Sequence, residues 1–267
     1  MSGARAAFRL IVQPRMEGRL DMAIDQALTE AVGAGRSAHV VRLYGFSPPT
    51  LSLGRFQRIT GMLRPERLAQ DGVTLVRRPT GGHAVLHDDE LTYAVMLSKA
   101  VIAEELGDSR KRTVYDFIAR ILLHGLARLG VHGNINASRQ GDLRNPDCFR
   151  SSGEFEITGD DGRKLIGSAQ MTTRSAILQH GSIPMSNPGR RVFRYLAAQE
   201  PSDSRDPSSL NEQAGRALEF EEVEACFAAA FRECLPTEES SLRAEEQQAA
   251  DRALAEKFGS DAWNLAH

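Results

Sequence analysis

The chain has 267 residues, of which 41% are hydrophobic and 25% charged, a balance typical of one large globular domain. Its formal net charge of -2 gives no basic excess of the kind that nucleic-acid-binding proteins use, and no apolar run is long enough to cross a bilayer. We therefore expect no nucleic-acid partner and no membrane insertion. Because no signal peptide is apparent at the N-terminus, we expect a cytoplasmic location.

The cysteines limit the redox and metal chemistry of the chain. Three are present, Cys148, Cys226 and Cys234, and an odd number without a secretory signal argues against a disulfide framework. No paired-cysteine motif or His/Cys cluster indicates a metal site, so we expect none. Cys226 and Cys234 fall in a predicted helix and are interpreted as small buried side chains.

The first half of the chain mixes strand and helix signals. Apolar residues recur at helical spacing in 20–32 and again in 113–129, which Gly130 ends, so both segments are predicted to be helices. Short apolar runs rich in β-formers predict strands at 8–13, 40–44, 51–53, 73–76 and 91–97.

The second half begins with turn-rich strands and ends in helices. Segments 154–158 and 164–167 flank the turn 159–162 and predict a hairpin, and 176–180 predicts a further strand. The Ser, Asp and Pro residues of 201–209 indicate an exposed connector. Two helices are predicted near the end, at 219–235 and 241–258.

Strands that occur both in pairs and between helices indicate an α+β (mixed α/β) domain with a mixed sheet, not a strictly alternating parallel fold. We predict a single domain over 1–267, with 210–267 as a C-terminal helical segment packed on it.

One motif stands out as a candidate site, Arg77-Arg78-Pro79-Thr80-Gly81-Gly82-His83-Ala84-Val85-Leu86-His87-Asp88. Paired glycines let a ligand approach the main chain, and neighbouring arginines are suited to an anionic group. A glycine hairpin with solvated arginines is an equally good interpretation of these residues alone. The spacing matches neither a dinucleotide fingerprint nor a Walker loop.

This motif, continued through Glu90-Leu91-Thr92-Tyr93, resembles the signature of the biotin/lipoate protein ligase and octanoyltransferase superfamily. Further segments resemble the family in the expected order: Asp21-Met22-Ala23-Ile24-Asp25-Gln26-Ala27-Leu28, Pro49-Thr50-Leu51-Ser52-Leu53-Gly54, Gly162-Arg163-Lys164-Leu165-Ile166-Gly167-Ser168-Ala169-Gln170, Gln179-His180-Gly181-Ser182, Ser209-Leu210-Asn211-Glu212 and Trp263-Asn264. The resemblance implies a biotin/lipoate ligase-like catalytic domain with a largely antiparallel sheet flanked by helices.

Within the superfamily, the ligases activate a free acid with ATP, whereas the octanoyltransferases take an acyl group already held as a thioester. Cys148, in Pro146-Asp147-Cys148-Phe149, falls where the lipoate-ligase-like octanoyltransferases keep their nucleophile, and Lys164 falls at the family lysine. The resemblance therefore implies a Cys148/Lys164 acyltransferase that needs no cofactor.

The resemblance also implies which residues contact the substrate. These are Arg77, Gly81, Gly82, His83, His87, Gly167, Ser168, Ala169 and His180. His83 departs from the subfamily pattern, in which arginine is common at this position.

The implied chemistry needs a cysteine thiolate, yet a thiol with a pKa of about 8.5 is only roughly 3% ionised at pH 7. A neighbouring ammonium lowers such a pKa, and Lys164 is the candidate. Lys164 as a base, as a hydrogen-bond donor or as a charge partner all remain open. The implied donor is octanoyl-acyl carrier protein. The implied acceptor is a lipoyl-domain protein, such as the glycine cleavage H protein or an E2 subunit of the 2-oxo acid dehydrogenases.

Three other functions fit the residues. An ATP-dependent lipoate–protein ligase would use Lys164 without Cys148. An amidotransferase that moves octanoyl between lipoyl domains would also use a cysteine, so Cys148 does not exclude it, and the donor requirement distinguishes it. A binder of acyl carrier protein with an inactive site would use neither. We expect a monomer.

Overall fold

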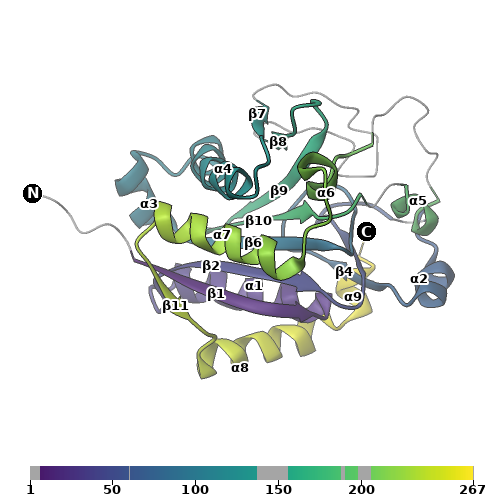
Figure 1. Cartoon of the computed structure of the whole chain (residues 1–267). Coiled ribbons are helices and arrows are strands. Elements are labelled where there is room, and N and C mark those ends of the chain that lie inside the picture. Colours follow the sequence, from purple (N-terminus) through teal and green to yellow (C-terminus); the bar gives the residue numbers. More distant parts are fainter. Residues whose placement is uncertain (1–6, 60, 137–155, 188–189, 198–205, 267) are drawn as a thin grey trace, which may run out of the picture.

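The computed structural model describes residues 7–59, 61–136, 156–187, 190–197 and 206–266 (Figure 1). Among these residues, eight strands form one sheet in the spatial order β11 (Thr237–Ser240), β1 (Phe8–Met16), β2 (His39–Phe46), β6 (Glu90–Ser98), β10 (Ala176–Pro184), β9 (Lys164–Thr172), β8 (Glu156–Thr158) and β7 (Asn134–Asn136). The pairs β11–β1 and β1–β2 are parallel, and the other pairs are antiparallel. The predicted mixed, largely antiparallel sheet is confirmed.

A second sheet of three strands has the order β4 (Thr74–Arg77), β3 (Thr50–Leu53) and β5 (Val85–His87). The helices are α1 (Gly18–Gly33), α2 (Pro65–Asp71), α3 (Lys99–Leu106), α4 (Lys111–Arg128), α5 (Val192–Tyr195), α6 (Leu210–Ala214), α7 (Phe220–Cys234), α8 (Ala244–Ala253), the π-helix η1 (Leu254–Phe258) and α9 (Asp261–Asn264). No helix in the described part of the chain is long and apolar enough to span a membrane.

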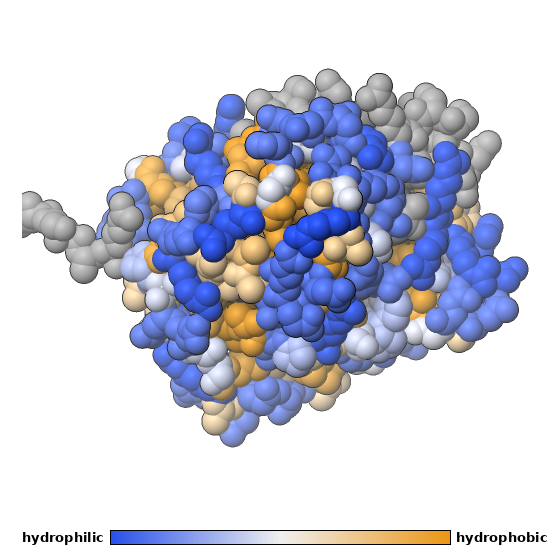
Figure 2. Space-filling model, in the orientation of Figure 1, coloured by the Kyte–Doolittle hydropathy of each residue, from blue (hydrophilic) through white to orange (hydrophobic). Residues whose placement is uncertain are grey.

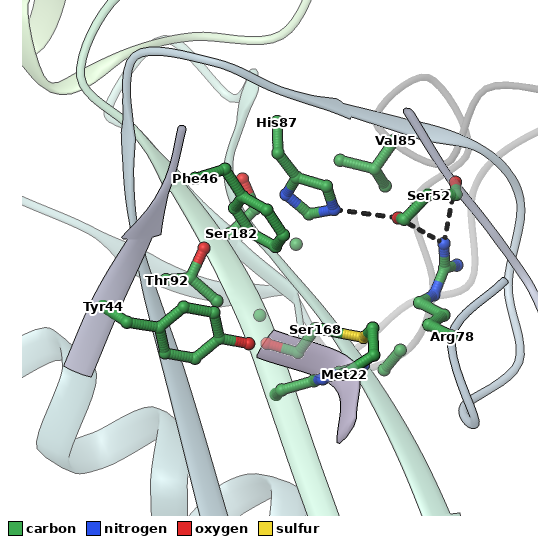
Figure 3. Close-up of a pocket in the computed structure, with 14 residues that line it drawn as sticks. Met22, Tyr44, Phe46, Ser52, Arg78, Val85, His87, Thr92, Ser168 and Ser182 are labelled. Carbon is green, nitrogen blue, oxygen red and sulfur yellow. Dashed lines mark hydrogen bonds between the residues drawn. The ribbon is translucent and has the colours of Figure 1, made fainter. Parts of the chain in front are cut away.

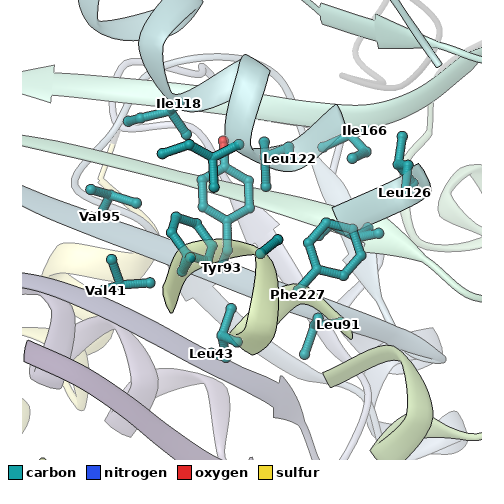
Figure 4. Packing of buried hydrophobic residues seen from close by; sticks show 14 of the residues in the cluster. Val41, Leu43, Leu91, Tyr93, Val95, Ile118, Leu122, Leu126, Ile166 and Phe227 are labelled. Carbon is teal, nitrogen blue, oxygen red and sulfur yellow. The ribbon is translucent and has the colours of Figure 1, made fainter. Parts of the chain in front are cut away.

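Helices cover both faces of the large sheet, because its central strands are apolar on both sides. Along β2, Val41 and Leu43 join the core under α4 and α7, while Val40 and Tyr44 join the core under α1. Figure 4 shows the first of these cores, in which Tyr93 of β6 lies among side chains of both helices. On the outer face that carries α7, hydrophobic and hydrophilic residues are interspersed (Figure 2).

Helix α1 begins at a side-chain cap. The Glu17 carboxylate accepts hydrogen bonds from the backbone N–H groups of Arg19 and Leu20, which have no partner within the helix. One face of the helix, including Met22 and Leu28, is buried on the sheet. The predicted helix at 20–32 is therefore confirmed, with about one more turn of chain.

The C-terminal region differs from the prediction in two respects. Strand β11 lies between the two predicted helices, and the second helix starts at Ala244 and ends as a π-helix. The predicted exposed connector at 201–209 is wrong in its described part, because Pro207, Ser208 and Ser209 are buried. The Ser208 N–H donates to the Lys164 carbonyl at 2.8 Å, so this segment packs against the end of β9.

Helix α8 is joined to the sheet by a buried ion pair. Arg9 of β1 donates to Glu246 at 2.5 and 3.0 Å, and both side chains are almost fully buried. Burial alone would raise the pKa of Glu246, but the hydrogen bonds from Arg9 and from the Arg243 backbone, with the charges of both arginines, together outweigh it and hold this pKa below its usual value. Arg9 and Glu246 therefore both remain charged in the interior, and each charge is stabilised there by the other.

Removing one partner of this pair should be costly. We expect Glu246→Ala to lower the free energy of unfolding by about 3–5 kcal/mol, because it leaves the Arg9 charge buried and without its carboxylate. Denaturant unfolding measures the change. Asp116→Asn, which breaks the exposed Arg120–Asp116 pair, is the matched control and should cost no more than about 1 kcal/mol. Equal losses in the two variants would contradict this account of α8.

Candidate active site

A mostly apolar pocket lies on the α1 face of the large sheet, beside the small sheet (Figure 3). Its lining residues are Met22, Tyr44, Phe46, Ser52, Arg78, Val85, His87, Thr92, Gly167, Ser168, Ala169, His180, Gly181 and Ser182. The aromatic and aliphatic side chains make the interior of the pocket apolar. The few polar side chains at its wall are hydrogen-bonded within the protein.

The first polar chain runs from Asp25 through His180 to Thr80. Asp25 Oδ2 lies 3.1 Å from His180 Nδ1, and His180 Nε2 lies 2.7 Å from Thr80 Oγ1. An ionised carboxylate only accepts, so Nδ1 carries the proton and Nε2 accepts from the threonine hydroxyl. Asp25 also accepts from Arg42 at 2.8 Å and from Tyr44 at 3.0 Å.

Burial determines the charge states in this chain. It lowers the pKa of His180, so the imidazole is neutral at pH 7. Burial alone would raise the pKa of Asp25, but the hydrogen bond from His180 and the charge of Arg42 more than compensate, and this pKa is lowered. Asp21 also accepts a hydrogen bond from Arg42. Burial raises the pKa of Asp21 to about 7. Within this network, Asp25 is therefore the carboxyl group that stays ionised at neutral pH.

A second chain has the same form. His87 Nδ1 lies 2.7 Å from Glu90 Oε1, and His87 Nε2 lies 2.8 Å from Ser52 Oγ. Glu90 also accepts from Thr92 at 2.6 Å and from the Ser182 hydroxyl. Both ring nitrogens of His87 are therefore engaged, and the ring stacks on Phe46 with centroids 4.2 Å apart.

Arg78 ties this chain to the glycine loop. Its guanidinium donates to Ser52 Oγ at 3.0 Å and to the carbonyls of Gly81 and His83 at 2.8 and 2.7 Å. The Arg78 side chain therefore holds the loop by binding its backbone carbonyls, and Arg78 itself lines the pocket. Sequence reasoning missed Arg78 as a site residue, although it stood beside Arg77 in the motif.

Of the two glycines predicted to allow close approach, only Gly82 lies against another part of the chain, and a Cβ on Gly81 would meet no atom within 4 Å. Gly82 has a φ of +95°, which favours glycine. A Cβ on Gly54 would lie 1.8 Å from the Gly82 carbonyl oxygen. The loop thus folds directly onto the end of β3.

Arg77 points away from the pocket. Its guanidinium donates to the carbonyls of Gly54 and Gln57 at 2.7 and 2.9 Å and to that of Trp263 at 3.2 Å. Its backbone N–H donates to Asn264 Oδ1 at 2.9 Å. Arg77 therefore fastens α9 to the small sheet, and its contact with substrate stays a prediction.

Strand β9 supplies the opposite wall of the pocket. Gly167, Ser168 and Ala169 line it, and Gly181 of β10 adjoins them so closely that a Cβ there would lie 2.5 Å from the Gly167 carbonyl oxygen. Lys164 begins the strand. It is buried, and its Nζ lies 2.5 Å from Glu156 Oε1 of β8.

Five of the predicted substrate-contacting residues thus line one pocket: His87, Gly167, Ser168, Ala169 and His180. Gly81, Gly82 and His83 form the adjoining loop, and Lys164 stands at the start of the β9 wall. Cys148 lies outside the described residues, so its distance from Lys164 is not assigned. Sequence reasoning also missed Ser182, although it quoted the segment that contains it. In the described part of the chain, no group of three or more His, Cys, Asp or Glu residues is arranged to hold a metal ion.

The Thr80–His180 bond offers a test of how the glycine loop is held. Thr80→Val keeps the side-chain shape but removes the hydroxyl, leaving buried His180 Nε2 without its donor. We expect the free energy of unfolding to fall by about 1–3 kcal/mol. Chemical denaturation measures this, with Thr74→Val, at a half-buried position in β4, as the control. A loss no larger than that of the control would show that the bond contributes nothing.

Known proteins match this chain over nearly its whole length. Octanoyltransferase LipM of Kyrpidia tusciae is 36% identical over an alignment of 275 positions, gaps included, which covers 96% of this chain and 98% of that protein. Octanoyltransferase LipM of Exiguobacterium sibiricum is 34% identical over 279 positions, with coverage of 96% and 98%.

Two solved structures share the fold. A lipoate-protein ligase A bound with ATP superposes with a TM-score of 0.78 at 20% identity, covering 97% of this chain and 98% of that one. A bipartite lipoate protein ligase from Thermoplasma acidophilum, from a study that includes its E2 lipoyl domain, gives a TM-score of 0.77 at 18% identity, covering 97% and 96%. The predicted fold class is confirmed. The family model of the lipoyl protein ligase A/B catalytic domain matches residues 17–232, and the chain belongs to that family.

Proposed function

We propose that this protein is an octanoyltransferase of lipoate biosynthesis, which moves an octanoyl group from octanoyl-acyl carrier protein to a lysine of a lipoyl-domain protein. The observation that carries the proposal is the match, over nearly the whole chain, to proteins named octanoyltransferase LipM. The pocket adds a physical reason, since its surface is almost entirely apolar, as an acyl chain requires.

The apolar lining supports binding of a saturated chain. Met22, Phe46, Val85 and Ala169 contribute aliphatic and aromatic surface, while both histidines at the wall are neutral or engaged. Burying about seven CH2-like groups at roughly 0.8 kcal/mol each gives at most about 5–6 kcal/mol. That energy is enough for pocket depth to select chain length.

The transfer itself needs no ATP. The Cys148 thiolate attacks the donor thioester and forms a new thioester of similar energy, and the acceptor lysine amine then forms an amide, which is downhill. Lys164 contributes a buried cation at the start of β9, the strand whose residues 167–169 line the pocket, and a cation near a thiol favours the thiolate. The Cys148/Lys164 pair is the part of the proposal that rests on the sequence alone.

The basic clusters at 110–112 and 190–194 are weak candidates for docking the acidic donor. Arg110 pairs with Asp108, Arg191 with Asp88, and Arg194 with Asp71. These partners neutralise much of the charge that steering would need. For the acceptor, a lipoyl domain is favoured by the pairing of a ligase of this fold with an E2 lipoyl domain.

The acyl-enzyme is the first thing to test. After incubation with octanoyl-acyl carrier protein without ATP, intact mass spectrometry should show a gain of one octanoyl group on the native protein and on Cys226→Ala, which removes a half-buried helical cysteine. Cys148→Ala should show none, because the nucleophile is lost. Acylation of Cys148→Ala would assign the nucleophile elsewhere, and no acylation of the native protein would overturn the covalent mechanism.

Chain-length preference should depend on Ala169. This residue lies opposite His180 in the β9–β10 register and lines the pocket. Ala169→Phe should therefore exclude the far end of an octanoyl chain. We expect kcat/KM for octanoyl to fall by about fourfold for each CH2 excluded, while butyryl transfer changes little.

The matched control is Val12→Phe, which adds aromatic bulk on β1 at a residue that is 41% exposed. Competition between octanoyl and butyryl donors gives the ratio directly. An unchanged ratio in Ala169→Phe would place the acyl chain in a different part of the molecule.

A further inference from the structure

Two exposed hydrophobic side chains are grouped on one side of the small sheet. Among the described residues, the large hydrophobic side chains that are exposed are Val12, Phe56 and Leu265, and Phe56 is the most accessible at 74%. Phe56 lies in the turn after β3, and the Arg77 guanidinium donates to two carbonyls of this turn. The Arg77 N–H donates to Asn264, which directly precedes Leu265. Phe56 and Leu265 therefore belong to neighbouring segments that one residue holds together.

Positive charge surrounds Phe56. Arg55 and Arg58 flank it and are exposed, and the segment 54–59 contains no acidic residue. The Arg55 guanidinium lies 5.3 Å from the centroid of the Phe56 ring. Neither arginine is paired with a carboxylate of a residue that the structure describes. The neighbouring segment 261–266 adds one acidic residue, Asp261, so the two segments together carry two positive charges and one negative charge.

The flanking arginines differ from those of the other basic clusters. Arg110, Arg191 and Arg194 are each paired with an aspartate, which neutralises much of their charge. The charges of Arg55 and Arg58 are available to a partner instead. A basic surface with an aromatic side chain at its centre has the composition of a protein interface, in which aromatic residues and arginine are enriched.

This surface adjoins the wall of the pocket. Ser52 of β3 lines the pocket, and the chain runs from the end of that strand into the turn that carries Phe56. The Arg55 N–H donates to the carbonyl of Thr80, at the start of the glycine loop, at 2.8 Å. The turn is therefore bound to the glycine loop as well as to Arg77. Because its backbone is already fixed, little ordering cost remains for a partner to overcome.

We propose that Arg55, Phe56, Arg58 and Leu265, the Phe56 surface, are the docking site of the acyl carrier protein that donates the octanoyl group. The inference rests on the proposed function. The carrier protein is acidic, so its carboxylates pair with the two arginines and increase the rate of encounter. Phe56 is the apolar anchor at the centre of the contact.

The position of the surface favours the donor over the acceptor. No side chain of the Phe56 surface lines the pocket, so a partner bound there reaches the pocket only with a group that extends from its own surface. An acyl carrier protein holds its acyl group at the end of a long, flexible prosthetic arm. An acceptor lysine has a short side chain, so a lipoyl domain must bind closer to the pocket.

The test compares two donors of the same acyl group, octanoyl-acyl carrier protein and octanoyl-pantetheine, which lacks the protein. Arg55→Glu/Arg58→Glu should lower kcat/KM for the carrier-protein donor by about tenfold or more, because two attractive charges become repulsive. Phe56→Ser should lower it by about tenfold through loss of the anchor. The values for octanoyl-pantetheine should change little. Added salt should lower the native value for the carrier-protein donor more than that of the double variant.

Two control variants are matched to these changes. Arg36→Glu/Arg252→Glu makes the same charge change at two other exposed arginines, and Val12→Ser removes the exposed hydrophobic side chain on β1. Both should resemble the native protein with either donor.

Three results would contradict the account. Unchanged values for the carrier-protein donor, or an equal loss with both donors, would overturn the docking site. A higher KM for the lipoyl-domain acceptor, with that for the donor unchanged, would overturn it in favour of an acceptor surface. No transfer by the native protein from either donor would instead overturn the proposed function.

Discussion

The structure depends on a charged group that it buries completely. Arg42, in the middle of the central sheet, is fully buried, and it is tolerable there because Asp21 and Asp25 of α1 accept its hydrogen bonds at 2.5 and 2.8 Å. Leaving any member of such a network unpaired costs several kcal/mol. Helix α1 is therefore fixed on the sheet in one register, by bonds as well as by apolar packing.

The same network reaches the site. Asp25 is hydrogen-bonded to His180, which is hydrogen-bonded to Thr80. Thr80 begins the glycine loop, and Arg78 donates to a carbonyl of the same loop. The pocket walls are formed by strands and by a loop that buried hydrogen bonds hold in place. Such rigid supports are what substrate positioning requires. The polar residues of the motif thus act mainly on one another and shape an apolar slot between them.

This arrangement explains how far the sequence could be interpreted. Apolar periodicity was enough to predict α1, α4 and most strands of the large sheet, and the turn at 159–162 was enough to predict the β8–β9 hairpin. The resemblance brought His87, His180 and the 167–169 segment to one pocket. These features are encoded locally or in a motif.

The features that were missed depend on distant partners. Arg77 and Arg78 look alike in sequence, but consecutive residues of an extended chain point to opposite sides, and only the fold shows which side faces the pocket. Strand β11 forms because it pairs with the edge of β1. Glu246 is charged in the interior because Arg9 donates hydrogen bonds to it. The exposed connector was mispredicted at Ser208 because its partner, the Lys164 carbonyl, lies far away in sequence.

The most direct test of the central claim is octanoylation of a lipoyl-domain lysine by this protein with octanoyl-acyl carrier protein as the donor, run with and without ATP. The account predicts the same rate of amide formation in both, and no product from free octanoate with ATP. Product that appears only from free octanoate and ATP would contradict it and make the protein a ligase.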